Sequence, residues 1–277
     1  MTTIDAGQAV LLGIVEGLTE FLPVSSTAHL KLTESLLGLP VSDASVVAYT
    51  ALIQTGAIAA VILYFWRDLF ALVRAGLGGL FDASTRQTEE FRLAWWIVAA
   101  TIPLVVVGVA AKPLIEGPLA SLWVVAFSMV LGSAYLWAAD RRSARGPGRQ
   151  DFGFVDSMLI GGSQILALLL PGFSRSGASI STGILLGIDR VRATRLSFLF
   201  SIPALTGAGL YELKDASASG SFGPLALGIV VAFAVSFASI AWLLRFVGTH
   251  SFSAFIWYRS VFAGALVIAL ITGAVAA

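Results

Sequence analysis

The chain has 277 residues, 17 of them basic and 16 acidic, so charged residues make up 12% where a soluble domain carries roughly 25%. Hydrophobic residues reach 57%, which excludes both a water-soluble globule and a disordered chain. The net charge of +1 argues against nucleic acid as a partner, and the absence of cysteine excludes disulfides, thiolate nucleophiles and cysteine-ligated metals. The composition therefore predicts an integral membrane protein in contact with membrane lipids.

The first part of the chain predicts a helical hairpin that enters the membrane without crossing it. Residues 1–15 contain no Lys or Arg, so the basic start of a signal peptide is missing and we expect residues 1–22 to belong to the mature fold. The apolar stretch 9–22 is too short to span and stops at Pro23, before a small polar run. Polar backbone at membrane depth must be buried in protein or line a wet cavity. We therefore predict a re-entrant hairpin over residues 6–38.

A second hairpin of the same kind is predicted over residues 155–188, where the short apolar stretch stops at Pro171. Six other stretches are long enough to cross the membrane as helices, and none shows the two-residue alternation of a strand. These spans lie near residues 46–66, 93–111, 119–139, 196–213, 225–247 and 255–276. No soluble domain is expected, because the longest connections, 67–92 and 140–154, are too short.

The two hairpins match at an offset of 148 residues, which places Glu16 on Gln164, Pro23 on Pro171 and Ser26 on Ser174. Each half of the chain then holds one hairpin and three spans. Because three is odd, the second half must enter the membrane from the opposite side. The predicted fold is an all-α polytopic membrane protein with an inverted-topology repeat, residues 1–145 and 150–277. Interrupted segments at matching positions of two such halves indicate the binding site.

The distribution of arginine predicts the orientation. The connections 67–92 and 140–154 carry four arginines each and lie on one side in this topology, whereas the other side has only Lys31, Lys112 and Lys214. The positive-inside rule makes the arginine-rich side cytoplasmic. Both chain ends then lie outside the cytoplasm, the first hairpin enters from the outer face, and the two polar loops can meet near the middle of the membrane.

Two carboxylates, Glu16 and Glu20, lie in the first short apolar stretch, four residues apart and so on one helix face. Each ionised carboxylate in a bilayer costs about 2.5 to 3.5 kcal/mol on insertion scales. A bound cation, a proton or a nearby arginine must offset this cost. Structural pairing with arginine is the simpler interpretation; a functional role is favoured because Arg175 lies in the matching hairpin.

Arg175 has the surroundings of an anion-binding residue. Ser174 and Ser176 flank it, Gly177 follows, and a half-helix is expected to begin there. A guanidinium fork, hydroxyl groups, free backbone N–H groups and a helix N-terminus together hold phosphate. The alternative is that Arg175 only neutralises Glu20.

The first polar loop supplies Ser25, Ser26 and Thr27, and His29 follows one helical turn after Ser25, in a half-helix expected from Ala28 to Leu37. Helix capping alone also explains a serine at this position, and a lone histidine can be purely structural. The buried amides Gln54 and Gln164 are assigned supporting roles around the polar cluster.

Two motifs carry a resemblance to a known family: EGLTEFLPVSSTAH over residues 16–29 and PGFSRSGAS over residues 171–179. The sequence resembles the bacterial undecaprenyl-diphosphatase family of the bacitracin-resistance type along nearly the whole chain, including LIQTGA at 52–57 and IWYR at 256–259. The resemblance implies a multi-pass hydrolase of the bacterial inner membrane that removes the terminal phosphate of undecaprenyl diphosphate. The chain has Ala28 and Ser179 where the family usually has Gly and Thr.

The resemblance also implies a set of site residues. Its glutamate motif falls on Glu16 and Glu20, its serine pair on Ser25 and Ser26, its histidine on His29 and its arginine on Arg175. Metal dependence implied by the family agrees with Glu16 and Glu20 as ligands of Mg²⁺ or Ca²⁺. We expect Glu20, Ser26, His29 and Arg175 to be catalytic. The expected substrate-binding residues are Ser25, Thr27, Ser174, Arg175, Ser176, Gly177, Ser179, Gln54 and Gln164.

Several alternatives stay open at this point. The nucleophile is either Ser26, which we prefer, activated by Glu20 or His29, or a metal-bound water. From a different class of function, a secondary transporter or lipid flippase also uses inverted repeats with broken helices. A structural scaffold does not explain three ionisable groups in the membrane. A homodimer is neither favoured nor excluded, and we expect the site to open toward the periplasm.

Overall fold

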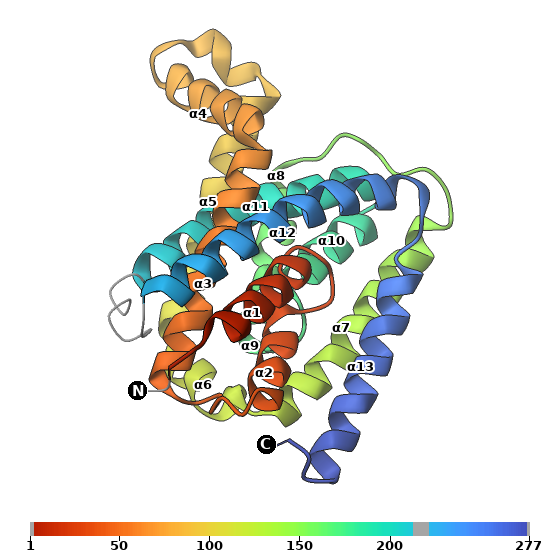
Figure 1. The fold of residues 1–277 in the computed structure, drawn as a ribbon. Helices are drawn as coiled ribbons and strands as arrows, with labels where there is room; N and C mark the ends of the chain where they lie inside the picture. Colours follow the sequence, from red (N-terminus) through yellow and green to blue (C-terminus); the bar gives the residue numbers. More distant parts are fainter. Residues whose placement is uncertain (1–2, 213–221, 276–277) are drawn as a thin grey trace.

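The computed structural model describes residues 3–212 and 222–275, and over these ranges all its regular secondary structure is helical (Figure 1). Judged by length and composition, five helices within the described residues can cross a membrane. They are α3 (Ala44–Tyr64), α5 (Glu89–Ala110), α7 (Leu122–Ser143), α12 (Phe222–Thr249) and α13 (Ser253–Ile271). The prediction of an all-α, multi-pass membrane protein is confirmed, and these helices cover five of the six expected spans.

The sixth expected span lies in α11 (Arg190–Glu212), which is 23 residues long. Three arginines in its first two turns make it less apolar than the other five helices. Its middle is buried in the protein, as Leu196 and Phe198 show. Because contact with other helices replaces contact with lipid there, α11 does not need the hydropathy of a lipid-facing helix. Residues 213 and 276 of the expected spans lie outside the described residues.

Short helices occupy both predicted hairpins, two in the first and three in the second. The first consists of α1 (Ala6–Thr19) and α2 (Ser26–Leu36); Asp5 and Gln8 form a capping box at its start, with the Gln8 N–H donating to Asp5 at 2.9 Å. The second consists of α8 (Phe154–Gly162) and α9 (Gln164–Leu169), followed after a break by α10 (Arg175–Leu185). Half-helix α2 begins at Ser26, two residues before the expected start at Ala28.

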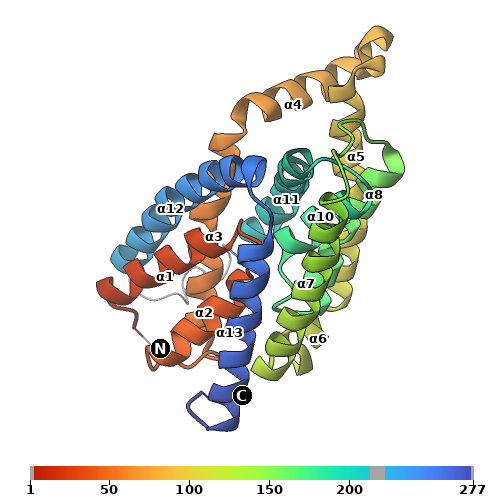
Figure 2. The same cartoon turned by 90° about the vertical axis from the view of Figure 1, so that its right-hand side faces the viewer.

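One helix lies where only a connection was expected. α4 (Trp66–Phe81) turns Leu72, Gly76 and Gly79 inward and leaves a face with Phe70 and Leu77 exposed. The α4–α5 pair protrudes from the body of the bundle (Figures 1 and 2). Charged residues interrupt the apolar stretch of α4, so its hydropathy does not indicate a span. Shorter elements fill the remaining connections: the 3₁₀ helices η1 (Ala83–Gln87) and η2 (Pro118–Ala120), and α6 (Lys112–Glu116).

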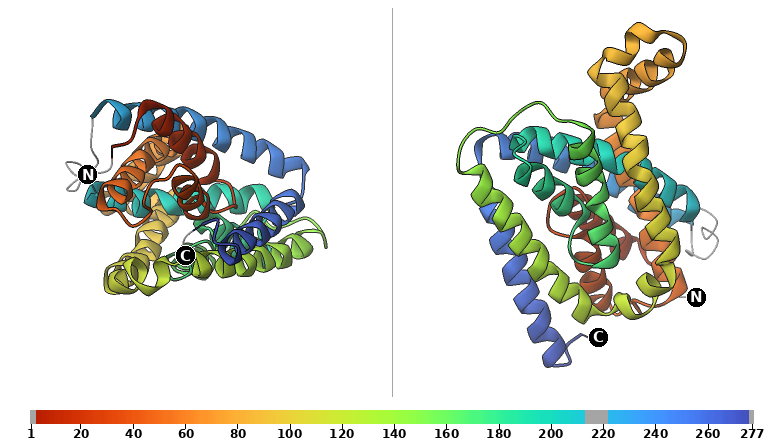
Figure 3. Two further views of the ribbon diagram at one scale, coloured as in Figure 1. Left: turned by 60° about the horizontal axis from the view of Figure 1, so that its bottom comes forward. Right: turned by 180° about the vertical axis from the view of Figure 1, so that it is seen from behind.

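Close helix contacts fix the elements around the two hairpins. α12 packs against both α1 and α3. A Cβ atom on Gly56 of α3 would lie 2.2 Å from the Ile229 carbonyl oxygen of α12, and one on Gly17 of α1 would lie 2.9 Å from the Ala232 carbonyl oxygen. Small residues therefore let these backbones approach. On another flank, α7 and α13 run side by side (Figure 3) and enclose Ala28 of α2 in an apolar cluster.

The connections divide between the two ends of the molecule. The turns between α4 and α5, between α7 and α8, and between α12 and α13 lie at the end marked by α4. The segment before α1, the C-terminal end of α13 and the connection between α2 and α3 lie at the opposite end (Figures 1 and 2). The arginine-rich connections thus share one end.

Candidate active site

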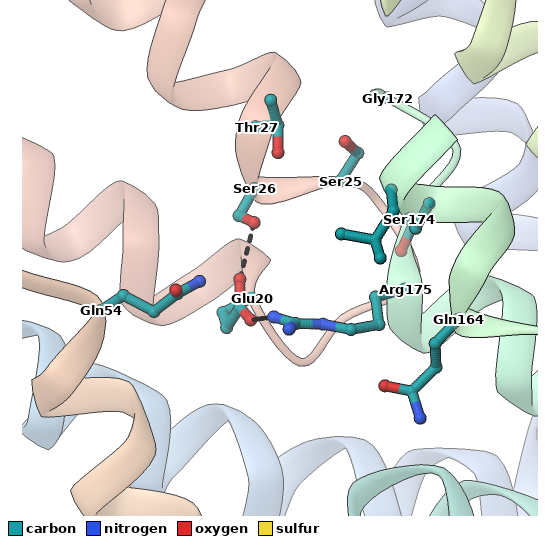
Figure 4. A pocket seen from close by; sticks show the side chains of 11 residues that line it. Glu20, Ser25, Ser26, Thr27, Gln54, Gln164, Gly172, Ser174 and Arg175 are labelled. Atoms are coloured by element: carbon teal, nitrogen blue, oxygen red, sulfur yellow. Dashed lines mark hydrogen bonds and ion pairs between the residues drawn. The ribbon is translucent and has the colours of Figure 1, made fainter. Parts of the chain in front are cut away.

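A cavity of about 180 Å³ lies where the two hairpin breaks meet. Its walls come from α1 and α2, from α3, and from α9 and α10 (Figure 4). Most of the lining is polar or glycine; the apolar exceptions are Ala167 and Leu168, which form part of one wall. The lining residues are Glu20, Ser25, Ser26, Thr27, Gln54, Gln164, Ala167, Leu168, Gly172, Ser174 and Arg175. Residues 155 positions apart in the sequence therefore share one polar cavity.

Glu20 is the centre of the polar contacts in this cavity (Figure 4). One carboxylate oxygen accepts a hydrogen bond from the Ser26 hydroxyl at 2.7 Å, and the other forms an ion pair with the Arg175 guanidinium. The Glu20 side chain is only 3% exposed, whereas Arg175 is 26% exposed. A hydroxyl group, a carboxylate that accepts its hydrogen bond and a cation suited to an anionic ligand are thus directly connected.

Both half-helices that follow the breaks begin in the same unusual backbone conformation. Ser25 precedes α2 with φ of 76°, and Ser174 precedes α10 with φ of 77°; they are the non-glycine residues with positive φ among the described residues. Such a conformation costs on the order of 1 to 3 kcal/mol and is typical of functional sites. Two helix N-termini therefore point at one cavity, which favours an anion.

This geometry corrects the predicted alignment of the two hairpins. Ser174 corresponds to Ser25, and Ser26 corresponds to Arg175, because α2 and α10 each have 11 residues and follow these serines directly. The prediction that Ser26 matches Ser174 is wrong. The second loop has one more residue between its proline and its serine, so the offset changes from 148 to 149 within the loop. An ungapped comparison of the sequence could not detect this insertion.

The two loops also contact each other directly. The Ser176 hydroxyl donates to the Leu22 carbonyl oxygen at 2.9 Å, and Ser174 accepts a hydrogen bond from the Gly177 N–H at 3.1 Å. Gly172 has φ of 102°, and a Cβ atom there would lie 2.4 Å from the Val125 carbonyl oxygen of α7. Only glycine fits this position, so the second loop is held against α7.

Five of the expected site residues lie outside the cavity lining: Glu16, His29, Ser176, Gly177 and Ser179. Ser176 and Gly177 hold the second loop, as described, and Ser179 donates to the Arg175 carbonyl oxygen at 2.9 Å and contacts the Ser197 hydroxyl at 2.6 Å. His29 has both ring nitrogens engaged: Nδ1 with the Ser25 carbonyl oxygen and Nε2 with the Tyr258 hydroxyl, each at 2.7 Å. His29 therefore lies outside the cavity, in contact with Ser25 and Tyr258. The Ser26 hydroxyl is hydrogen-bonded to Glu20 and not to His29.

Glu16 lies one turn before Glu20 and is 1% exposed. Neither of its carboxylate oxygens has a hydrogen-bond partner among the described residues, and its polar neighbours are Gln54, Glu20 and Arg175. The buried Oε1 atom of Gln164 is likewise without a partner there. No group of three His, Cys, Asp or Glu side chains gathers in the described part of the chain. One or two carboxylates completed by phosphate oxygens are the usual ligands of Mg²⁺, so the donor set fits a metal held jointly with a substrate.

Arg259 of α13 belongs to this region as well, although its IWYR motif was given no role in the site on sequence grounds. It is fully buried and donates hydrogen bonds to carbonyl oxygens of both hairpin loops. A signal was present in the sequence, because Arg259 is the only charged residue in the expected span 255–276.

Known proteins are similar in sequence to this chain over nearly its full length. The family model described as "Bacitracin resistance protein BacA" matches residues 9–265. The chain belongs to this family. It is 58% identical over 272 residues to "Undecaprenyl-diphosphatase 1" of Streptomyces avermitilis, covering 98% of each chain. It is 59% identical to a protein of the same name in Streptomyces coelicolor, covering 94% of each, and 47% identical to "Undecaprenyl-diphosphatase" of Cutibacterium acnes, covering 95% of this chain and 96% of the relative.

Ser25 and Ser174, the two serines with positive φ, are predicted to differ in their contribution to stability. Ser174→Ala removes the acceptor for the Gly177 N–H and should lower stability by about 1 kcal/mol, as loss of a helix cap does. Ser25 makes no side-chain cap hydrogen bond, so the expectation that it caps α2 is wrong and Ser25→Ala should leave stability unchanged. Thermal unfolding in detergent measures both variants. Equal losses would contradict this assignment of the caps.

Proposed function

We infer that this chain is an undecaprenyl-diphosphatase, which hydrolyses undecaprenyl diphosphate to undecaprenyl phosphate and inorganic phosphate. The observation that carries this function is the contact of Ser26, Glu20 and Arg175 in one cavity formed by both hairpins. The names of the relatives support the same conclusion. The product is the lipid carrier of cell-wall synthesis, and its recycling accounts for the bacitracin resistance that names the family.

Binding of the diphosphate is assigned to the charged and polar lining of the cavity. Arg175 presents a planar fork of donors, and the N-terminus of α10 adds backbone N–H groups. Ser25, Thr27 and Ser174 add hydroxyl groups, and the amides of Gln54 and Gln164 face the same space. Ser176, Gly177 and Ser179 act on the substrate indirectly, by holding the loop that carries Arg175. Donors already in place where charge develops stabilise the transition state.

The prenyl chain requires an apolar exit from this polar cavity. Ala167 and Leu168 of α9 supply the apolar part of the lining and are only partly buried. Leu168 occupies the position that Glu20 has in the first hairpin at the offset of 148 residues. We place the first isoprene units against this wall, with the remaining chain in lipid.

Ser26 is the proposed nucleophile. Its oxygen attacks the terminal phosphorus while its proton passes to Glu20, and the bond between the bridging oxygen and that phosphorus breaks to release undecaprenyl phosphate. Water then hydrolyses the phosphoserine to inorganic phosphate and free Ser26. Because both nitrogens of His29 are engaged elsewhere, its proposed role is to hold α2 and the Ser25 carbonyl. Direct attack by a metal-bound water remains the alternative.

A divalent metal ion, Mg²⁺ or Ca²⁺, is proposed to be held by Glu16 and Glu20 together with substrate phosphate oxygens. The unpartnered Glu16 carboxylate supports this assignment. When bound, the ion would neutralise phosphate charge and polarise the phosphorus–oxygen bonds. Glu20 then serves both the ion and the Ser26 proton, while Arg175 holds the phosphates.

The two halves are proposed to form an inverted-topology repeat in the inner membrane, residues 1–145 and 150–277. The paired breaks, the 11-residue half-helices and the common end of the arginine-rich connections support it. The positive-inside rule then makes that end cytoplasmic. Thr27 is exposed at the cavity, on the half-helix nearer the opposite end, so we propose a periplasmic opening. A homodimer is compatible with this arrangement.

Phosphate release from undecaprenyl diphosphate by the purified protein in detergent tests the function. The wild type should release inorganic phosphate, and Ser26→Ala should lower kcat by on the order of 10³-fold or more while still binding substrate. Ser260→Ala, an exposed serine of α13, is the matched control and should be unaffected. A wild type without phosphate release would favour a transporter or flippase. Normal turnover of Ser26→Ala would leave water as the attacking group.

The metal assignment predicts a specific effect of Glu16→Gln, which keeps the side-chain size and removes the charge. The Mg²⁺ concentration for half-maximal activity should rise by roughly 10- to 100-fold, as loss of support for a metal typically causes. Excess chelator should abolish wild-type activity. Glu34→Gln, at a buried glutamate of α2 that has no part in the proposed site, should leave the metal titration unchanged. Full activity in chelator would assign Glu16 a structural role.

The orientation can be measured on single-cysteine variants, because the natural chain has no cysteine. A membrane-impermeant maleimide should label Pro40→Cys, in the connection between α2 and α3, on intact spheroplasts. Arg145→Cys, between α7 and α8, should react only after the membrane is opened. The reverse labelling pattern would place the cavity mouth on the cytoplasmic side.

A further inference from the structure

Arg259 is a fully buried cation whose hydrogen bonds reach three separate parts of the protein. Nη1 donates to the Pro23 carbonyl oxygen of the first loop at 2.9 Å. Nη2 donates to the Gly172 and Phe173 carbonyl oxygens of the second loop, at 3.2 and 2.9 Å. The remaining bonds attach the same guanidinium to α7, through the Met129 carbonyl oxygen and the Ser133 hydroxyl, each at 3.2 Å.

The partners of Arg259 exclude an ordinary salt bridge as its role. The five acceptors of its hydrogen bonds are all neutral carbonyl or hydroxyl oxygens. Its approach also requires Gly132 of α7, where a Cβ atom would lie 2.3 Å from Nη2. A buried guanidinium is tolerated only when its donors are satisfied, and here they are satisfied chiefly by loop backbone. The arrangement is therefore specific to the breaks in the two hairpins.

We propose that Arg259 is the positioning residue that fixes the two hairpin loops to each other and thereby aligns Ser26 and Glu20 with Arg175. The effect on catalysis rests on the proposed function. The joining of the two loops by Arg259, called the clamp below, does not depend on that function. Arg259 does not line the cavity, so it acts through the backbone and not on the substrate.

The peptide planes show how the clamp reaches the site. In a trans peptide the C=O and N–H groups point in opposite directions. When the Phe173 carbonyl oxygen accepts from Arg259, the N–H of Ser174 is directed away from Arg259. The Pro23 carbonyl oxygen stands two residues before Ser25 in the same way. Arg259 thus holds the backbone one residue before Ser174 and two residues before Ser25, next to the points at which α10 and α2 begin.

Distance measurements between the hairpins test this proposal. Spin labels at Leu36→Cys of α2 and Leu166→Cys of α9, both exposed, report the separation of the first and second hairpins in the cysteine-free chain. The wild-type background should give one narrow distance distribution. Arg259→Met should broaden or shift it and lower kcat by on the order of 10²-fold, the effect of a small misplacement of reacting groups, with a much smaller change in KM.

Three further variants complete the experiment. Arg259→Lys retains the charge but cannot reach all three elements, so it should behave like Arg259→Met, and it decides the result if Arg259→Met does not fold. Ser133→Ala removes one acceptor on α7 and no loop contact, so it should keep the wild-type distances and kcat. Leu243→Ala, buried in α12, should lower the unfolding temperature without changing the distances.

The outcomes are distinguishable. Unchanged distances in the Arg259 variants, with or without a loss of kcat, would overturn the clamp. Broadened distances with normal kcat would overturn its role in alignment, and equal broadening in Leu243→Ala would reduce it to general stability. A wild type that releases no phosphate would refute the proposed function, while the distance measurements would still decide whether Arg259 joins the loops.

Discussion

The contact between Glu20 and Arg175 is the interaction on which the rest of the site depends, because each residue comes from a different hairpin. Either charge alone would be expensive at membrane depth, since little water is available to solvate it. The ion pair between them offsets this cost and therefore stabilises the contact between the two hairpins. The second oxygen of the Glu20 carboxylate contacts Ser26, so the same interaction that joins the hairpins also orients the hydroxyl group. Stability and chemistry are therefore assigned to one carboxylate.

A broken helix at membrane depth leaves backbone carbonyl groups that no helix satisfies, and the structure meets this constraint with a side chain. Arg259 donates to three such groups from both loops, and Ser176 donates to a fourth, on Leu22. The proposed repeat is asymmetric at the positions that face the cavity. The first hairpin supplies carboxylates and the Ser26 hydroxyl, whereas the second supplies Gln164 in place of Glu16 and Arg175 in place of Ser26. One duplicated backbone can thus hold a cationic and an anionic half of a single site.

The sequence was sufficient for the features that depend on local pattern. The length of apolar stretches predicted six spans, five of which coincide with helices long and apolar enough to cross a membrane, and proline followed by serines predicted both breaks. Features set by tertiary contacts were not accessible in this way. The sequence of α4 contains arginine among apolar residues, so its pattern predicts a connection between spans. In the structure it is a helix that packs on α5. The additional residue in the second loop shifts the repeat, and only the backbone of Ser25 and Ser174 shows where. His29 was expected near Ser26 because of its sequence spacing, but the helix directs it toward Tyr258.

The arrangement around Glu20 also suggests how the site distinguishes a resting from a working state under the proposed function. Without substrate, Arg175 and Ser26 share the two oxygens of one carboxylate, and the Arg175 side chain keeps partial access to the cavity. A diphosphate carries more negative charge than Glu20 and offers the guanidinium two oxygens at once, so it competes directly for Arg175. When Arg175 turns to the phosphates, Glu20 retains Ser26 and gains a free oxygen beside the unpartnered Glu16. Under the proposed function, the second Glu20 oxygen becomes available to the metal only when the anion is in place, whereas Ser26 keeps its proton acceptor throughout.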